Sequence, residues 1–570
     1  MQRLLGFGLL VVFAELVLLQ PVRAQFSGSY QTNIISGVVS NWDGDYFVGS
    51  NEVFDALQVV DGAVLNDAQG FIGYFGATNS VEVSGSGSLW SNDSDLRLGY
   101  FADDNQLLVS GGGAVVSRYG YAGLYGTHNR IQVSGFGSVL TSEAFYIGYF
   151  GGDNRLVVTN GGAVNGNVIV GFLADSNTAL ITGFGSVCSN VSALTVGSSG
   201  NGNSLAIRDG GAAFGNTGWI GINGATNNNV LVEGSGSVWS NTSDLLLGLN
   251  GGWSNTLVVQ HGGTVINGNA QIGWEGTNNG VVVTGGGSVW NNADVFVGPR
   301  GAGNSVLISN SAALISESSY VGYSGTSNYI MVTGSGSTWS NQHTLYVGYG
   351  LESYGNFVTI SDYGQVVASN IVVAANNSLV LKSANLTATD GLLISSGAIL
   401  KGTGIISANL TLAGTLAPGN SAGAITNYGN VVLLPTAVLQ FELAGTTQGS
   451  GYDFMLVTNG AVTLDGALQV SFVNGFETNV SNSDTFTLLT VTGVLSGAFT
   501  NVADGARLVT AGGEGSFLVT YNGNELMLSN YQAIPEPSAR ILGELGLVIL
   551  SILRRSTPRL FSPCIGLICG

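Results

Sequence analysis

One short pattern recurs twelve times along this chain and constrains its fold more than any other feature. Each copy reads Asn, any residue, an aliphatic residue, any residue and a second aliphatic residue, and successive copies begin 23 to 28 residues apart. The copies begin at Asn79, Asn105, Asn129, Asn154, Asn177, Asn203, Asn228, Asn255, Asn279, Asn304, Asn328 and Asn356. A glycine lies six to eight residues before each of these asparagines. A fixed period of this length is typical of a solenoid, in which each repeat stacks on the next.

The pattern indicates strands rather than helices, because its aliphatic residues alternate over five positions and are bounded by Gly and Asn. Alternate side chains of a strand share a face, so Asn154, Leu156 and Val158 are expected to point inward together. Stacked at about 4.8 Å, such asparagines can hydrogen-bond amide to amide. We therefore predict an all-β fold: a right-handed parallel β-helix of roughly thirteen coils of about 25 residues, followed by a less regular β region.

The chain divides into four segments. Residues 1–24 resemble a secretory signal peptide, with a basic residue, an apolar run over 4–19 and small residues before a cleavage site. Residues 25–370 hold the coils in super-repeats of about 50 residues, because a Gly-x-Gly-Ser turn recurs in every second coil. Residues 371–532 keep short aliphatic runs but lose the period, and residues 533–570 form a separate tail. These features predict an exported protein.

Composition excludes some classes of function. The formal net charge is −19, which argues against nucleic acid as a partner, because phosphates demand a basic surface. Only 9% of the residues are charged, far below the usual quarter or so. Two of the three cysteines lie in the last seven residues and Cys188 stands alone, so no disulfide framework is expected.

Two stretches carry family resemblances. Residues 416–421 (Leu-Ala-Pro-Gly-Asn-Ser) and 452–470 resemble surface proteins that contain autotransporter-associated β-strand repeats. In the tail, Pro535, Glu536 and Pro537 precede an apolar stretch over 541–553 and then Arg554 and Arg555. This order resembles the PEP-CTERM sorting signal of bacterial secreted proteins.

The PEP-CTERM resemblance implies recognition by a membrane-embedded, exosortase-type sorting protease, transient insertion of the tail in the membrane, and delivery to the cell envelope surface or the extracellular matrix. The tail departs from the family pattern in two ways. Its apolar stretch holds about 13 residues, fewer than the roughly 20 that span a bilayer, and Glu544 interrupts it. A further 15 residues follow Arg555.

Ionisable residues fall into turn positions of the repeat. His128, His261 and His343 each occupy a slot that Asp, Asn or Ser fills in other coils, so no catalytic role is predicted for them. Asp153 and Asp175 precede the repeated Asn on adjacent coils, where they could share Ca²⁺ or simply cap the turn, and capping is the favoured interpretation. A second acidic set recurs two coils apart, too far for chelation of one ion, and is interpreted as structural: Asp45, Asp95, Asp244 and Asp294.

A tryptophan recurs at one position of the coil, which Cys188 takes once: Trp90, Trp239, Trp290 and Trp339. This column could stack sugar rings or pack at a coil corner, and packing is favoured. Overall, the near equivalence of the coils predicts a non-enzymatic surface or matrix protein, structural or adhesive, with polysaccharide as a partner and no cofactor. The alternative is a β-helix polysaccharide lyase or glycoside hydrolase, which needs a cleft with a basic residue or paired carboxylates.

Overall fold

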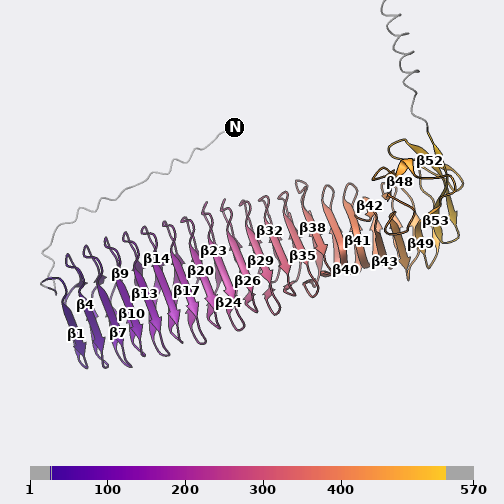
Figure 1. Cartoon of the computed structure of the whole chain (residues 1–570). Helices are drawn as coiled ribbons and strands as arrows, with labels where there is room; N and C mark the ends of the chain where they lie inside the picture. Colours follow the sequence, from indigo (N-terminus) through magenta and orange to yellow (C-terminus); the bar gives the residue numbers. More distant parts are fainter. Residues whose placement is uncertain (1–25, 27, 535–570) are drawn as a thin grey trace, which may run out of the picture. The chain divides into compact units, whose positions relative to one another are not determined.

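The computed structural model describes residue 26 and residues 28–534. These residues belong to two compact units, the first ending at Ala293 and the second beginning at Asp294. Both units consist of short β-strands, as the sequence predicts (Figure 1). Within the described residues, the 3₁₀ turn η1 (Phe476–Thr478) is the one helical element.

Three parallel sheets run through the first unit, each taking one strand from every coil. The first sheet contains β1 (Thr32–Ser36), β4 (Ala56–Val60), β7 (Ser80–Ser84), β10 (Gln106–Ser110), β13 (Arg130–Ser134), β15 (Arg155–Thr159), β17 (Thr178–Thr182), β20 (Ser204–Arg208), β23 (Asn229–Glu233), β26 (Thr256–Gln260) and β29 (Gly280–Thr284). The second contains β2 (Val39–Asn41), β5 (Val64–Asp67), β8 (Leu89–Asn92), β11 (Ala114–Val116), β14 (Val139–Ile147), β16 (Ala163–Val170), β18 (Val187–Ser189), β21 (Ala212–Gly215), β24 (Val238–Asn241), β27 (Thr264–Ile266) and β30 (Val289–Asn291). The third contains β3 (Tyr46–Val48), β6 (Gly70–Ile72), β9 (Asp95–Leu98), β12 (Tyr119–Ala122), β19 (Ala193–Val196), β22 (Thr217–Ile220), β25 (Leu245–Leu247) and β28 (Ala270–Ile272), together with the later residues of β14 and β16.

A coil is built of three consecutive strands, such as β7, β8 and β9. Each of them pairs in parallel with its counterpart in the preceding coil and in the following coil: β7 with β4 and β10, β8 with β5 and β11, and β9 with β6 and β12. Equivalent residues of adjacent coils therefore lie side by side. The predicted parallel β-solenoid is confirmed.

The second unit has the same parallel construction. Its strands are β31 (Val295–Val297), β32 (Ser305–Ser309), β33 (Ala313–Ser316), β34 (Ser319–Val321), β35 (Tyr329–Thr333), β36 (Thr338–Asn341), β37 (Thr344–Val347), β38 (Phe357–Ser361), β39 (Gln365–Val373), β40 (Ser378–Ile394), β41 (Ile399–Leu412), β42 (Thr415–Pro418), β43 (Ala424–Tyr428), β44 (Val431–Leu433), β45 (Val438–Leu443), β46 (Phe454–Thr458), β47 (Val462–Leu464), β48 (Ala467–Phe472), β49 (Phe486–Val491) and β50 (Leu495–Gly497). Parallel pairing continues unbroken from β38 through β40 and β41 to β50.

The number of coils is larger than predicted. The described residues make about 18 turns rather than roughly thirteen, because the coils continue after residue 370, where the Asn pattern fades. The less regular β region is confined to the end of the described chain. There β51 (Arg507–Val509), β52 (Gly515–Asn522) and β53 (Glu525–Ala533) pair antiparallel, and β53 also pairs antiparallel with β49.

Aliphatic side chains fill the interior of each coil. In β15, for example, Leu156 and Val158 are buried, whereas the outward-facing Arg155 is exposed. The residue before the repeated Asn adopts a left-handed backbone, as at Asp104, His128 and Asp153. Left-handed backbone favours Gly, Asn and Asp, which explains the residue types that recur there.

Candidate functional site

Within each unit the repeated asparagines form a buried column, and all twelve are at most 1% exposed. The Oδ1 atom of Asn177 accepts two hydrogen bonds from Asn154 in the preceding coil, one from the backbone N–H at 2.9 Å and one from Nδ2 at 3.2 Å. The Nδ2 group of Asn154 also donates to the carbonyl oxygens of Gly126 and Gly151. We call this arrangement the Asn ladder. The side-chain amides of the ladder are hydrogen-bonded within the protein and buried. The ladder is therefore a structural element and is not available to a ligand.

The glycine that precedes each repeated Asn makes room for the ladder. Gly148 has a φ of +79°, and a Cβ there would overlap the side chain of Asn177 in the next coil. Gly171 stands in the same relation to Asn203, and Gly322 to Asn356. The glycine of one coil is thus spatially complementary to the Asn of the following coil, which accounts for their joint recurrence.

Each unit adds one residue to the twelve predicted asparagines of the ladder. In the first unit Asp55 takes the place before Asn79, accepting the Gln31 backbone N–H, and burial raises the pKa of its carboxyl. In the second unit Asn377 follows Asn356, and its Oδ1 accepts bonds from both nitrogens of that residue. Asn377 fits the Asn-x-aliphatic pattern at a spacing of 21 residues, so a wider spacing window would have found it.

The tryptophan column packs in the interior. All four of its members are 0% exposed, so the packing interpretation is confirmed and these rings cannot serve as a sugar platform. Cys188 lies in the same row, opposite Val164 and Ala213, and is 1% exposed. Burial raises the pKa of its thiol to about 12, which makes it unreactive at neutral pH.

A buried carboxyl lies beside this column in the first unit. Asp67 is 3% exposed and its Oδ2 accepts a hydrogen bond from Nε1 of Trp90 at 2.6 Å, whereas its Oδ1 has no hydrogen-bond partner among the described residues. Burial raises the pKa of Asp67 to about 7, with the Trp90 bond acting in the opposite direction. Asn267 makes the same contact to Trp290, at 3.0 Å.

The acidic turns act as caps. The Oδ1 atom of Asp175 accepts the backbone N–H of Asn201 at 2.6 Å, and Oδ1 of Asp103 accepts that of Thr127 at 2.6 Å. Asp153 directly precedes the ladder residue Asn154 and has a left-handed backbone, whereas Asp175 lies two residues before Asn177. Within the described residues, no group of three or more His, Cys, Asp or Glu residues is placed to hold a metal ion. Calcium binding by Asp153 and Asp175 stays a hypothesis.

The second acidic set is also engaged with the backbone or with a neighbouring side chain. Oδ1 of Asp244 accepts the Asn269 N–H at 3.3 Å, and Oδ1 of Asp294 accepts the Ser318 N–H at 3.0 Å, each in the next coil. Asp95 forms an ion pair with Arg97 at 2.7 Å. At Asp45, burial raises the pKa of the carboxyl, and the guanidinium of Arg97 opposes that effect.

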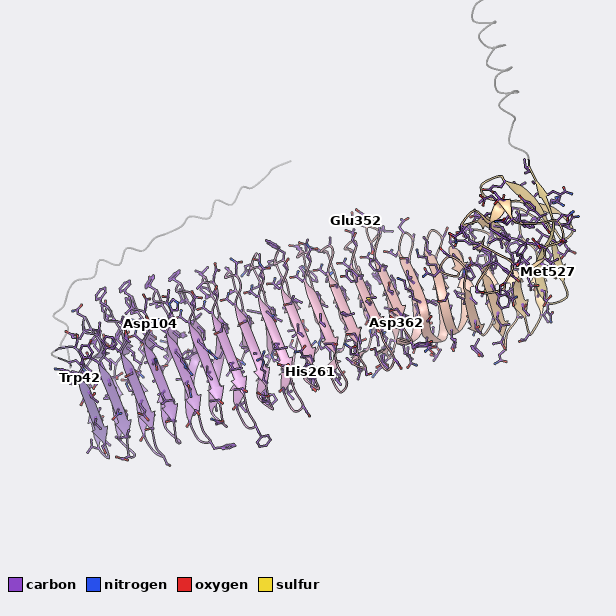
Figure 2. All side chains as sticks on the ribbon, in the orientation of Figure 1. Trp42, Asp104, His261, Glu352, Asp362 and Met527 are labelled. Carbon is purple, nitrogen blue, oxygen red and sulfur yellow. The ribbon has the colours of Figure 1, made fainter. Side chains whose placement is uncertain are left out.

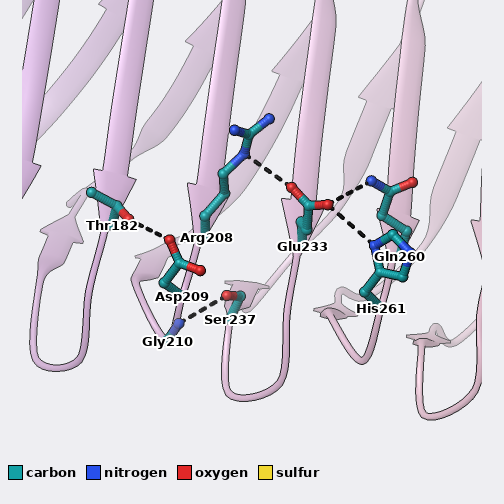
Figure 3. A network of polar contacts seen from close by, with 8 residues as sticks. All are labelled: Thr182, Arg208, Asp209, Gly210, Glu233, Ser237, Gln260 and His261. Atoms are coloured by element: carbon teal, nitrogen blue, oxygen red, sulfur yellow. Dashed lines mark hydrogen bonds and ion pairs between the residues drawn. The ribbon is translucent and has the colours of Figure 1, made fainter.

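One polar network brings together an arginine, a carboxylate and an imidazole (Figure 3). Glu233 pairs with Arg208 at 3.1 Å on one side and with Nδ1 of His261 at 3.1 Å on the other, and it also accepts a hydrogen bond from Gln260. Hydrogen bonds from Gln260 and His261 hold the pKa of Glu233 below its usual value. Arg208, Glu233 and His261 come from consecutive coils, and the His261 side chain lies exposed at a turn (Figure 2). His128 and His343 are likewise exposed turn residues.

Several exposed aromatic residues of the first unit lie together on one surface, over the third sheet and the turn that follows it. Four rings exposed by 46–57% follow one another coil by coil, with centroids 5.1–5.2 Å apart: Phe75, Phe101, Tyr125 and Phe150. Edge-to-face contacts join them to a second row beside it: Tyr74, Tyr100 and Tyr149. A third row continues onto the strands: Phe71, Tyr121 and Tyr146. We call these ten residues the aromatic face.

The aromatic face is nearly neutral and carries hydroxyl groups. Its embedded cation, Arg97, lies over the rings of Phe71 and Tyr100 and is neutralised by Asp95. Burial raises the pKa of Tyr121 to about 12, so that hydroxyl stays protonated at neutral pH. The Gly-Tyr-Phe triplets that end at Phe75, Phe101 and Phe150 are the sequence signal of this face. The Asn repeat pattern does not include their aromatic residues, so it does not predict the face.

The predicted leader and the sorting motif lie outside the described residues, as do Arg554 and Arg555. Within residues 26 and 28–534, no helix is long and apolar enough to cross a membrane.

Comparisons with known proteins give little further identification. No protein-family model matches the chain, and no curated protein matches its sequence. A solved structure described as a TibC-catalysed, hyper-glycosylated fragment of TibA is similar over 76% of this chain and 97% of the fragment, with 12% identity and a TM-score of 0.21. A TM-score of this size is too low to transfer any property of that fragment to this chain.

Proposed function

We propose that this chain is a non-enzymatic structural or adhesive protein of the cell surface or extracellular matrix, associated with polysaccharide. The observation that carries the proposal is the equivalence of the coils. The asparagines, the turn acids, the tryptophans and Cys188 each fill a structural position that recurs from coil to coil. An active site breaks a repeat at one place, because its residues must converge on one substrate.

The alternative is a polysaccharide lyase or hydrolase, and one observation favours it. The Arg208–Glu233–His261 network is a place where basic and acidic groups meet on adjacent coils. However, Glu233 engages both partners at once, and all three side chains lie on an outward surface at 28–69% exposure. Catalytic acids and bases are usually found in clefts that shift their pKa values toward neutrality, whereas the pKa of Glu233 is lowered. The network is therefore assigned to surface stabilisation.

Export and sorting belong to the same proposal. Residues 1–24 would direct secretion, and the tail from residue 533 would be recognised by an exosortase-type protease near Pro535, Glu536 and Pro537. The apolar stretch over 541–553 would hold the precursor in the membrane transiently. Arg554 and Arg555 would stay cytoplasmic, as basic residues beside a membrane segment tend to do.

Mass spectrometry of protein extracted from the cell surface tests this proposal. We expect peptides from residues 26–534 in the surface fraction and none from 556–570, because cleavage near Pro535–Pro537 removes the tail. Tail peptides recovered at full abundance in the mature surface form would contradict processing. Recovery of the coil peptides only from the cytoplasm would contradict the surface assignment itself.

A further inference from the structure

The coils do not need the aromatic face of the first unit in order to stay together. The equivalent turn positions in later coils of this unit carry Ser199, Asn223 and Asn250 without interrupting the strand pairing. The exposure of Phe75, Phe101, Tyr125 and Phe150 therefore needs another explanation. Exposed aromatic patches of this kind mark interaction surfaces.

We propose that the aromatic face binds an extended, uncharged polysaccharide lying along the stacking direction of the coils. This inference rests on the proposed function and names both the surface and the chemical class of the partner. Its first support is periodicity. The exposed rings stack on one another once per coil with centroids 5.1–5.2 Å apart, so they offer a regular row of ring edges. A linear polymer of sugar rings offers regularly repeated C–H and hydroxyl groups along its length.

Charge complementarity supports an uncharged polymer over other occupants. The chain carries a formal charge of −19, so an acidic polymer or a second copy of the chain meets overall repulsion. The face itself holds a neutralised Arg97–Asp95 pair and the hydroxyl groups of six tyrosines: Tyr74, Tyr100, Tyr121, Tyr125, Tyr146 and Tyr149. Hydroxyls and aromatic rings together match the mixed polar and apolar character of a neutral sugar, because phenolic groups both donate and accept hydrogen bonds.

Affinity electrophoresis of the full chain through gels that contain a soluble glycan tests the inference. Three neutral probes (mixed-linkage β-glucan, galactomannan and xylan) are compared with polygalacturonate and with chitosan. The variant is Phe101→Ala with Tyr125→Ala, which removes two central exposed rings. The matched control is Phe136→Ala with Phe184→Ala, because these rings are 71% and 83% exposed in the same unit but lie at Gly-x-Gly-Ser turns outside the face.

We expect at least one neutral glycan to retard the wild type, and the Phe101/Tyr125 variant to bind at least about tenfold more weakly, since truncating a central aromatic contact commonly costs more than a few-fold in affinity. The control should bind as the wild type does, and all three proteins should have the same melting temperature. Four results would overturn the inference: no retardation by any neutral glycan, equal binding by the Phe101/Tyr125 variant, binding to chitosan alone that salt abolishes, or a wild-type dimer that this variant converts to a monomer. If the protein is found at the surface but fails the gel test, this inference is wrong, whereas the proposed structural or adhesive function at the surface is not contradicted.

Discussion

Replacing Asn203 with Leu is expected to lower the free energy of unfolding by roughly 2–5 kcal/mol, since several buried polar groups lose partners at about 1–3 kcal/mol each. Oδ1 of Asn203 accepts the backbone N–H of Asn177 at 2.8 Å and its Nδ2 at 3.2 Å. The Nδ2 group of Asn203 donates to the carbonyl of Ala174 at 3.0 Å. Leucine supplies neither an acceptor nor a donor, and its branched end must also fit against Gly171.

Thermal melting followed by circular dichroism measures this effect. Ser204→Thr is the matched control, because Ser204 is the next residue of the chain and lies on the outward face of β20. The control should melt within the error of the wild type. An Asn203→Leu protein that melts with the wild type would show that the ladder amides contribute nothing, and the account of the repeat would then be wrong.

Asp67→Asn is expected to remove a pH dependence from the first unit. The pKa of Asp67 rises from 3.8 to about 7 because the carboxyl is buried. A group whose pKa is higher in the folded state contributes stability at pH values below its unfolded pKa, and this contribution is lost as the pH rises through the folded pKa. A shift of about three pKa units corresponds to roughly 4 kcal/mol, lost between about pH 4 and pH 8. The amide stays uncharged, and Asn267 shows that an amide oxygen in this position also accepts the tryptophan N–H, at 3.0 Å.

The stability of the first unit can be measured separately by pulse proteolysis in urea at pH 5 and pH 8. Peptides from the first unit are quantified by mass spectrometry. The separation matters because burial also raises the pKa of Asp453, in the second unit, to about 7. The wild type should be less stable at pH 8 than at pH 5, and Asp67→Asn should show a much smaller difference, the remainder coming from Asp45 and Asp55, whose pKa values burial also raises. Asp93→Asn should keep most of the wild-type difference, because Asp93 is exposed and its charge is the smallest of the causes that shift the pKa of Asp67. Equal wild-type stability at the two pH values would refute the buried, protonated Asp67.

The sequence predicts the ladder and the coil because both follow from strict local rules. Side-chain alternation in a strand fixes which face Asn154 shares with Leu156, and a fixed period places Asn177 beside Asn154. Local rules also place Asp153 and His128 in turns, since a left-handed residue is needed there. The handedness of the solenoid does not follow from these rules and remains a prediction.

The Asn pattern does not predict the coils after residue 370, because their strand pairing does not depend on it. Strands β40 and β41 pair along most of their length through backbone hydrogen bonds, which leave no mark on side-chain identity. Coil length also shortens there: Asn356 and Asn377 are 21 residues apart, outside the range of the other repeats. Asp55 was missed because the pattern demanded an amide, whereas a carboxyl oxygen accepts the same backbone bond.

The surface was harder to predict than the core. Trp90 lies within β8, and alternation over so short a strand does not say which of its faces points inward; the packed coil shows that Trp90 is buried. The rings of Phe75 and Phe101 lie in the turn after the third strand, where no alternation applies. Their mutual stacking depends on the register between coils, which is a tertiary property.

The central claim is that the coils form a binding and structural surface without an active site, and product analysis tests it most directly. The full chain is incubated with the three neutral glycans, polygalacturonate and chitosan, with and without Ca²⁺, and polymer length and new reducing or unsaturated ends are measured. We expect no shortening of any polymer, because Asp175 caps a backbone N–H of the next coil, and the Asp95–Arg97 and Glu233–Arg208 side chains are engaged with each other. Depolymerisation of a single substrate, lost in a Glu233→Gln variant that still folds, would contradict the claim and identify the Arg208–Glu233–His261 network as an active site.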